Sequence, residues 1–305
     1  MYDQKEGYME RYDSIIKAIK SIRGDSVVIE SDERVRGGDI NEAWKLHLSD
    51  GSDLFMKTNE SKNESFFKAE SDGLKAIADT NTISVPNIYG YGVDEEKDCA
   101  FLIMDVISKA EKGDHFWENF AEILAAMHKS PTEGFVNTGK YGFFEDNYIG
   151  AGKQVNTQKD SWVEFFVECR LGVMYDRVKE FLASGDRNAI ESIMAEPDKY
   201  LVEPLRPSLV HGDLWSGNFI VGENGNAWLV DPAAYVGNAE VDIAMTELFG
   251  GFRFEFYEEY HKVGLIMPGY EDRRDIYNLY HMLNHVHLFG RAYLGSVHTL
   301  LHKYI

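Results

Sequence analysis

Residues 211–218 read His-Gly-Asp-Leu-Trp-Ser-Gly-Asn, and Asp231 follows thirteen positions after Asn218. This stretch decides the fold, because it sets one candidate base and two candidate metal ligands at fixed spacing. Asp213 supplies a carboxylate, and Asn218, five residues later, supplies an amide oxygen. Mg²⁺ prefers oxygen ligands and needs only one or two protein carboxylates. The stretch therefore predicts a loop in which Asp213 is the base and Asn218 and Asp231 hold Mg²⁺.

The same order of groups occurs in the catalytic loops of kinases. There an Asp-x-x-x-x-Asn segment supplies the base and one metal ligand, and a later aspartate shares the metal. Two strand-like runs separate Asn218 from Asp231, and Asn224-Gly225 between them is a strong hairpin signal. If this pair centres the turn, Asn218 lies directly opposite Asp231, with Cβ atoms about 5 Å apart. A polar loop capping an ordinary hairpin is the structural alternative.

The composition indicates a folded protein and argues against several function classes. The 305 residues are 44% hydrophobic and 13% aromatic, which suits two domains with sizeable cores. A net charge of −20 argues against nucleic-acid binding, which needs a basic surface. Cys99 and Cys169 lie in no metal-ligand spacing, and no apolar segment approaches the length of a membrane span. We therefore expect a cytoplasmic protein with no nucleic-acid or membrane partner; the sequence carries no signal of its oligomeric state.

The first part of the chain alternates helix and strand signals. We predict a helix over 8–22 and strands over 26–30, 43–48 and 53–57. Between the first two strands, Gly37-Gly38 belongs to a glycine turn. A glycine loop followed by a strand, a hairpin and a second strand can bring backbone amide groups to the phosphates of ATP. Gly37 and Gly38 are therefore candidate ATP-binding residues.

Lys57 ends the last of these strands. Pairing the strands about the Asp50-Gly51 turn places Lys57 opposite Trp44, on the same apolar face as Phe55 and Leu46. A charge on an apolar face is costly unless it is paired. We therefore predict that Lys57 contacts ATP, as the corresponding lysine does in protein-kinase-like folds. An edge-strand lysine that reaches solvent is the alternative.

The expected partner of Lys57 lies on the next helix, predicted over 63–78. Glu70 is on the same helical stripe as the apolar residues Phe67 and Leu74, so its carboxylate is on the buried face. A lysine–glutamate pair of this kind positions ATP in kinases. Glu70 is therefore our candidate, and Glu64 is the competing assignment.

A change of composition marks the expected boundary between two lobes. An apolar run over 99–104 suits a buried strand, and the chain becomes polar from residue 108. Backbone groups of such a linker could bind adenine, so the candidates there are Asp105, Val106 and Ile107. An ordinary strand end is the alternative. We expect a nucleotide-binding lobe over 1–107 and a mainly helical lobe, for catalysis and acceptor binding, over 108–305.

Three further patterns have weaker functional readings. Residues 134–140 fit a phosphate-binding P-loop, but Tyr141 replaces the Ser or Thr that contacts Mg²⁺. His281 and His285 are four residues apart without the intervening glutamate of zinc proteases, so core or pocket histidines are favoured. His128 continues the apolar face of a helix predicted over 117–128, which favours a core histidine.

Several motifs together resemble the fructosamine kinase, or ketosamine-3-kinase, family. They are residues 211–218 with Asp231-Pro-Ala, the run 242–252, and Asn284-His285. His-Gly-Asp alone also occurs in aminoglycoside and choline kinases, whereas Leu-Trp-Ser-Gly-Asn is more specific. The resemblance implies an α+β, protein-kinase-like two-lobe fold, with a small lobe of antiparallel sheet plus helix. It also implies an enzyme that transfers the γ-phosphate of ATP to the 3-hydroxyl of a ketosamine, free or on a glycated protein. Because its products are unstable, the implied role is deglycation, or protein repair.

Carried over by position, the family motif implies roles for single residues. Asp213 would accept the hydroxyl proton, and Asn218 and Asp231 would hold Mg²⁺. Lys57 would contact the α and β phosphates of ATP, with Glu70 bracing it. Trp215 and His285 would lie in the sugar and amine site. Two departures are a glycine loop reduced to Gly-Gly-Asp, and Asp-Pro-Ala in place of the Asp-Phe-Gly of protein kinases, so that a Phe flip is not expected.

Two other functions stay open. A kinase for another small alcohol, such as an aminoglycoside or choline, would share the fold. A nucleotide-binding pseudokinase would usually lack one of Lys57, Asp213, Asn218 and Asp231, all of which are intact here.

Overall fold

The structure, a computed structural model, describes residues 10–35, 40–137 and 140–304. The glycine turn expected at Gly37 and Gly38 lies outside these residues. The chain falls into two compact units: Met1–Lys75 with Val85–Ser108, and Ala76–Ser84 with Lys109–Ile305. The division expected between residues 107 and 108 did not assign Ala76–Ser84 to the second unit.

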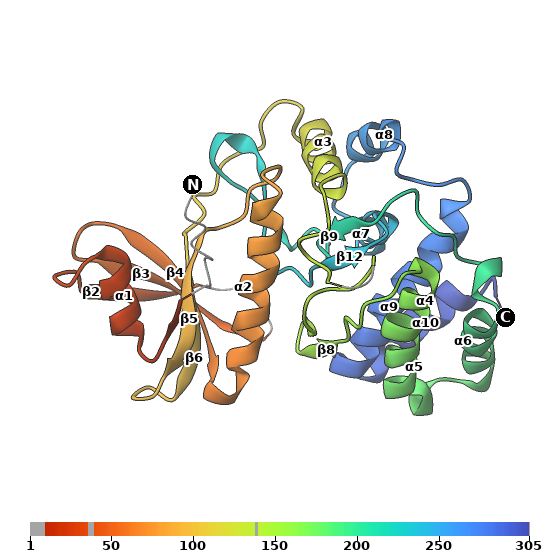
Figure 1. The fold of residues 1–305 in the computed structure, drawn as a ribbon, viewed down its shortest axis with the longest axis horizontal. Helices are drawn as coiled ribbons and strands as arrows, with labels where there is room; N and C mark the ends of the chain where they lie inside the picture. The colour runs from red at the N-terminus through yellow and green to blue at the C-terminus, as the bar shows by residue number, and fades with distance from the viewer. Residues whose placement is uncertain (1–9, 36–39, 138–139, 305) are drawn as a thin grey trace. The chain divides into compact units, whose positions relative to one another are not determined.

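The first unit is built on a six-stranded sheet with one helix on each face (Figure 1). The helices are α1 (Ile15–Arg23) and α2 (Glu64–Asp79), and a 3-10 turn (Ser61–Asn63) precedes α2. Neighbouring strands are antiparallel, except that β1 runs parallel to β5. In spatial order the strands are β1 (Arg11–Tyr12), β5 (Ile88–Asp94), β6 (Cys99–Met104), β4 (Asp53–Glu60), β3 (Glu42–Leu48) and β2 (Ile29–Val35).

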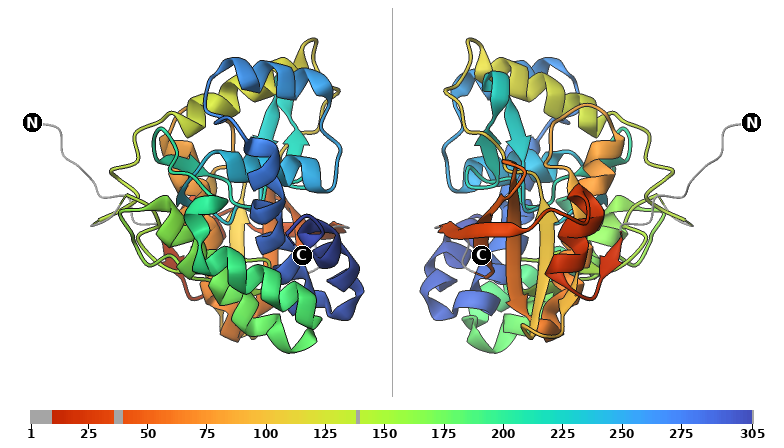
Figure 2. Two further views of the ribbon diagram at one scale, coloured as in Figure 1. Left: turned by 90° about the vertical axis from the view of Figure 1, so that its right-hand side faces the viewer. Right: turned by 90° about the vertical axis from the view of Figure 1, so that its left-hand side faces the viewer.

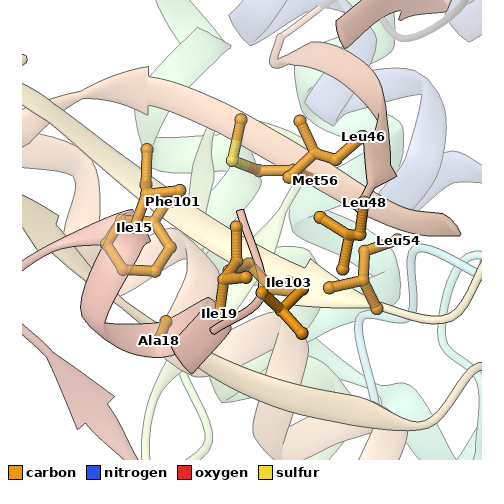
Figure 3. Packing of buried hydrophobic residues seen from close by; sticks show 10 residues of the cluster. Ile15, Ala18, Ile19, Leu46, Leu48, Leu54, Met56, Phe101 and Ile103 are labelled. Carbon is orange, nitrogen blue, oxygen red and sulfur yellow. The ribbon is translucent and has the colours of Figure 1, made fainter. Parts of the chain in front are cut away.

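Apolar side chains cover both faces of this sheet, because successive residues of a strand point to opposite sides. On β6, Phe101 and Ile103 face α1, whereas Leu102 and Met104 face α2 and pack around Phe67. Burying a large apolar side chain contributes about 1.5–3 kcal/mol. Figure 3 shows the cluster on the α1 face, which comprises Ile15, Ala18, Ile19, Val27, Leu46, Leu48, Leu54, Met56, Phe101 and Ile103.

The start of the chain differs from the expected helix over 8–22. Within its described part, Arg11 and Tyr12 form strand β1, and α1 begins only at Ile15. Long-range pairing overrides the helical pattern here. A Cβ on Gly92 of β5 would lie 1.8 Å from the Tyr12 carbonyl oxygen, so only glycine allows this approach. The strand expected over 26–30 is likewise shifted, to β2 at Ile29–Val35.

The register of β3 and β4 is one residue away from our expectation. Lys57 lies opposite Ala43, and Trp44 lies opposite Met56. The loop has three residues, not two, since the Leu48 N–H donates to Ser52 O and Gly51 adopts φ 82°. Lys57 therefore shares a face with Phe55 but not with Leu46, which the one-residue slip turns to the other side.

The described residues of the second unit are mainly helical (Figure 2) and also form three two-stranded sheets. The sheets are β7 (Asn147–Ile149) with β8 (Gly152–Gln154), β9 (Ser208–Val210) with β12 (Tyr235–Gly237), and β10 (Phe219–Val221) with β11 (Ala227–Leu229). The helices are α3 (Phe116–His128), α4 (Trp162–Phe166), α5 (Gly172–Val178), α6 (Ser184–Ala195), α7 (Glu240–Leu248), α8 (Phe254–Lys262), α9 (Tyr270–Phe289) and α10 (Leu294–Leu301). Short 3-10 turns lie at Lys179–Phe181, Pro197–Lys199, Glu223–Gly225 and Arg291–Tyr293.

Helix α9 is the central element of this unit. Twelve of its twenty residues are buried, and it contacts α5, α7 and α10. The α4 and α5 helices are joined by a π-helical turn (Val167–Leu171), so that the helical segment 162–178 is irregular in its middle. A second core of aromatic rings joins α3 to α8. In the part of the chain that the structure describes, no helix is both long and apolar enough to cross a membrane.

Candidate active site

The His-Gly-Asp loop is held in place by a buried carboxylate. Asp242, in the first turn of α7, accepts hydrogen bonds from the backbone N–H groups of His211 (2.7 Å) and Gly212 (2.9 Å). Its Oδ2 also lies 3.1 Å from His128 Nε2. Burial alone would raise the pKa of Asp242, but the hydrogen bond and charge of His128 lower it below its ordinary value. Asp242 is therefore ionised and fixes the backbone just before Asp213.

His128 is the core histidine that its helical position predicts. It is fully buried, and its Nδ1 lies 2.5 Å from the Tyr260 hydroxyl on α8. Both ring nitrogens of His128 therefore have buried hydrogen-bond partners, Tyr260 and Asp242. The role of Asp242 was not predicted, although an aspartate in the first turn of an apolar helix was a usable signal.

Asp213 and Asn218 lie side by side at the end of this loop. Asn218 Nδ2 donates to the carbonyl oxygen of Asp213 at 2.9 Å and to its Oδ2 at 3.1 Å. With Nδ2 directed at Asp213, Oδ1 is the Asn218 atom that can bind a cation. Burial, together with the charges of Asp231 and Asp242, raises the pKa of Asp213 to about 7, although the hydrogen bond from Asn218 opposes this shift. The three side chains therefore belong to one electrostatic cluster.

The hairpin after Asn218 corrects the expected register by one residue. Phe219 pairs with Leu229, and the Val230 N–H donates to Asn218 O at 3.1 Å, so Asn218 lies opposite Val230 instead of Asp231. The reason is a three-residue loop (Glu223–Gly225), closed by the Gly222 N–H that donates to Asn226 O, in place of a two-residue turn at Asn224-Gly225. Asp231 follows the strand pair in the left-handed conformation, with φ 55°.

The oxygen atoms of Asn218 and Asp231 suit a Mg²⁺ ion that is shared with a substrate, and not a metal site built from protein ligands alone. Among the described residues, no group of three or more His, Cys, Asp or Glu side chains could hold a metal ion. Mg²⁺ is commonly bound by one or two carboxylates together with water and substrate phosphates. Asp231 and Asn218 Oδ1 match such a donor set.

Lys57 and Glu70 form an ion pair within the first unit. Lys57 Nζ lies 2.6 Å from Glu70 Oε1, and each side chain is only 11% exposed. Lys57 pairs with Leu102 in the sheet and so points toward α2. The competing Glu64 binds Arg11, and β4 is an interior strand, so neither alternative assignment fits.

The carboxylate of Asp105 forms hydrogen bonds with other residues of the first unit. It accepts hydrogen bonds from Asn87 Nδ2 (2.7 Å) and from the Tyr89 hydroxyl (2.6 Å). These bonds tie the residue after β6 to the start of β5. The Asp105 carboxylate is therefore not expected to bind adenine. Adenine binding by the backbone of this segment, and by Val106 and Ile107, remains a prediction.

Trp215 and His285 belong to one continuous aromatic surface in the second unit. The Trp215 ring packs edge-on against Phe249 at 6.2 Å, and Phe249 lies 5.3 Å from the ring of His285. His285 in turn contacts Phe289 and Tyr293, at 5.6 and 4.9 Å. We call these five residues the aromatic wall. It extends from the loop that carries Asp213 to α9, and Phe249, which links its two ends, was not among the predicted site residues.

Comparison with known proteins identifies the family. The family model described as fructosamine kinase matches residues 11–305. The chain belongs to the fructosamine kinase family. A probable ketoamine kinase of Synechocystis sp. is 36% identical over 300 residues, which cover 95% of each chain. A chloroplastic protein-ribulosamine 3-kinase of Oryza sativa subsp. japonica is 35% identical over 292 residues, or 92% of this chain and 81% of the relative.

Solved structures agree with this membership and show the fold. A crystal structure of a candidate fructosamine-3-kinase from Haemophilus somnus has a TM-score of 0.85 at 31% identity, covering 96% of this chain and 97% of that chain. A macrolide 2'-phosphotransferase, at 15% identity and a TM-score of 0.62, shares the fold over 94% of this chain. The expected α+β, protein-kinase-like two-lobe fold is confirmed, and the protein is a phosphotransferase enzyme.

In this fructosamine kinase, two glycines shape the residues around Trp215. A Cβ on Gly217 would lie 2.3 Å from the Trp215 ring, so the indole can fold over the loop only because residue 217 is glycine. Gly251, in the loop after α7, has φ 97°, and its Cβ would lie 2.5 Å from Ser216 Cβ. Gly217 of the Trp-Ser-Gly motif and Gly251 of the Phe-Gly-Gly motif therefore allow close packing around Trp215 and Ser216.

This packing leads to a prediction for Gly217→Ala. We expect the new methyl group to displace the Trp215 ring and to raise the KM for the acceptor about three- to ten-fold, the value of one aromatic contact. ATP affinity should not change, because Asp231 and Asn218 keep their places. Gly134→Ala is a matched control, since its Cβ would meet nothing within 4 Å. An acceptor KM equal to that of the control would refute the proposed packing role.

Proposed function

We propose that the protein phosphorylates the 3-hydroxyl of ketosamines, such as fructosamine or ribulosamine adducts of amines, with ATP as the phosphate donor. The observation that carries the proposal is the placement of Asp213 beside Asn218, with the aromatic wall starting at Trp215 in the same loop. The names of the relatives, ketoamine kinase and protein-ribulosamine 3-kinase, support the same substrate class.

In this mechanism Asp213 acts as the general base. The acceptor hydroxyl gives its proton to the Asp213 carboxylate while its oxygen bonds to the γ-phosphorus, and the bond from that phosphorus to ADP breaks. The raised pKa of Asp213 suits this task, because a base is most effective when its pKa is near the working pH. Asp242 contributes by holding the backbone of the loop, so that the carboxylate needs little reorganisation during the reaction.

The proposed roles in nucleotide binding concern Lys57, its supporting residues and the two candidate metal ligands. Lys57, held by Glu70, would bind the α and β phosphates, and Gly37, Gly38, Val106 and Ile107 would supply backbone contacts. Asn218 and Asp231 would hold Mg²⁺, which supplies charge neutralisation at the transferred phosphate.

The acceptor is proposed to lie along the aromatic wall. A ketosamine carries its sugar on a basic amine, and aromatic faces attract cations. Trp215 is 39% exposed and Phe249 44%, so both rings can contact a ligand. The net charge of −20 also favours a cationic acceptor. The wall is open to solvent, which suits either a free amino-acid adduct or a glycated side chain of a protein, and deglycation is the proposed role.

The proposal is tested by ADP release with fructosyl-lysine, ribulosyl-lysine, choline and kanamycin, compared side by side. We expect kcat/KM to be highest for one of the two ketosamines. Preference for choline or kanamycin would support another small-alcohol kinase. ATP binding without turnover of any acceptor would support the pseudokinase alternative. A glycated protein tested beside free fructosyl-lysine separates the two acceptor forms.

A further inference from the structure

His281 on α9 presents a buried nitrogen to the catalytic aspartate. Its Nδ1 lies 3.9 Å from Asp213 Oδ1, and its side chain is 5% exposed. Among the described residues and their atoms, Nδ1 has no hydrogen-bond partner. The distance is too long for a direct hydrogen bond, which needs about 2.7–3.2 Å. A gap of this size between two polar atoms needs a third group to fill it.

The contact is not an ion pair. Burial lowers the pKa of His281 to about 3, and the nearby charges of His285 and Arg170 act in the same direction. The ring is therefore neutral at physiological pH, and one of its nitrogens carries a proton. A buried polar atom without a partner is destabilising in the free protein, so its retention at this position needs a reason.

His285, one turn further along α9, provides a comparison. Its Nδ1 donates to the backbone carbonyl of His281 at 2.8 Å, so that nitrogen is satisfied inside its own helix. His281 makes no such local bond in the described structure and directs Nδ1 at Asp213 instead. The Nδ1 atoms of the two histidines therefore have different surroundings, although the residues are one turn apart on the same helix.

The 3.9 Å separation allows a single oxygen atom to bond both His281 Nδ1 and Asp213 Oδ1. An oxygen at about 2.7–3.0 Å from both Nδ1 and Oδ1 would complete a hydrogen bond to each. A hydroxyl has one proton and two lone pairs. It can give the proton to Asp213 and accept the Nδ1–H bond of His281, which leaves one lone pair for the γ-phosphorus.

We propose that His281 binds the reacting hydroxyl of the acceptor through Nδ1–H and orients its proton toward Asp213. In the transfer, the hydroxyl oxygen bonds to the γ-phosphorus, the phosphorus bond to ADP breaks, and the proton passes to Asp213, while His281 keeps its proton throughout. The identity of the acceptor rests on the proposed function, but the contact itself serves any O–H group, that of an alcohol or of water.

The test compares His281→Leu with His281→Asn. Leucine removes the N–H donor, whereas asparagine can place an amide N–H near the position of Nδ1. We expect His281→Leu to lower kcat/KM for the acceptor about ten-fold or more, the usual loss for one hydrogen bond at a reacting group. His281→Asn should recover most of the loss. ATP affinity should match wild type in both variants, and the melting temperature of His281→Leu should not fall, because the change removes an unpartnered polar atom.

Acceptor-free hydrolysis of ATP separates this inference from the proposed function. There water takes the place of the hydroxyl, so hydrolysis should also slow in His281→Leu and recover in His281→Asn. A wild-type enzyme that phosphorylates no ketosamine would refute the proposed function but still allow this measurement. His287→Leu, at an exposed position of the same helix, is the control. Hydrolysis and acceptor kinetics unchanged in His281→Leu, or equal losses in both variants with a lowered melting temperature, would overturn the inference.

Discussion

Asp213→Asn should lower turnover by about 10²–10⁴-fold, the usual contribution of a general base. The carboxamide has nearly the same shape but cannot take the hydroxyl proton. ATP should still bind with wild-type affinity, because the change affects the group that acts on the acceptor. Steady-state ADP release and calorimetric titration with Mg·ATP measure the two effects separately.

Asp176→Asn is a suitable control for this variant. It removes the same charge from a side chain that is 70% exposed and paired only with Lys179 among its described contacts. We expect wild-type turnover in the control. Unchanged turnover in Asp213→Asn would remove Asp213 from the mechanism, and equal losses in both variants would point to an effect of charge alone.

Asp231→Asn should have the second large effect, on Mg·ATP binding. Asp231 has φ 55°, a conformation that asparagine also tolerates, so the substitution removes the charge with little backbone strain. We expect Mg·ATP affinity to fall at least about ten-fold, since even changes beside a metal ligand cost that much. Asp231→Ala would add strain and is therefore less informative.

Calorimetry at several Mg²⁺ concentrations checks this prediction. A metal ligand predicts that excess Mg²⁺ partly restores ATP binding in Asp231→Asn. Wild-type affinity at every concentration would argue against the metal role. A second readout is the acid limb of turnover: because the charge of Asp231 raises the pKa of Asp213, its removal should shift that limb to lower pH.

The sequence predicted the parts of the site that depend on local spacing. Asp213 and Asn218 share one loop, so five residues of separation sufficed to bring them together. The pairing of Lys57 with Glu70 followed from a helical stripe and an apolar strand face, two patterns that do not depend on exact register. Helix α3 and its core histidine were likewise within reach of periodicity alone.

The exact strand register and the contacts between distant residues could not be predicted from the sequence. In both hairpins the expected pairing was wrong by one residue, because loop length and a left-handed glycine set the alignment, and the dipeptides Asp50-Gly51 and Asn224-Gly225 did not reveal it. The support from Asp242 and the approach of His281 to Asp213 depend on how α7 and α9 pack. Residues thirty or more positions apart meet there, and no spacing in the sequence encodes that packing.

The bond from Asp242 to the loop ends on backbone N–H groups, and this affects how the family can diversify. In this loop Asp242 binds the backbone N–H groups of His211 and Gly212, and these bonds do not depend on the side chains that follow Asp213. Residues such as Trp215 can therefore be exchanged without moving the base. Chemistry and selectivity are thus separable properties of one short segment. A laboratory selection that randomises positions 215 and 249 could yield variants that phosphorylate other alcohols, while Asp213, Asn218 and Asp231 stay unchanged.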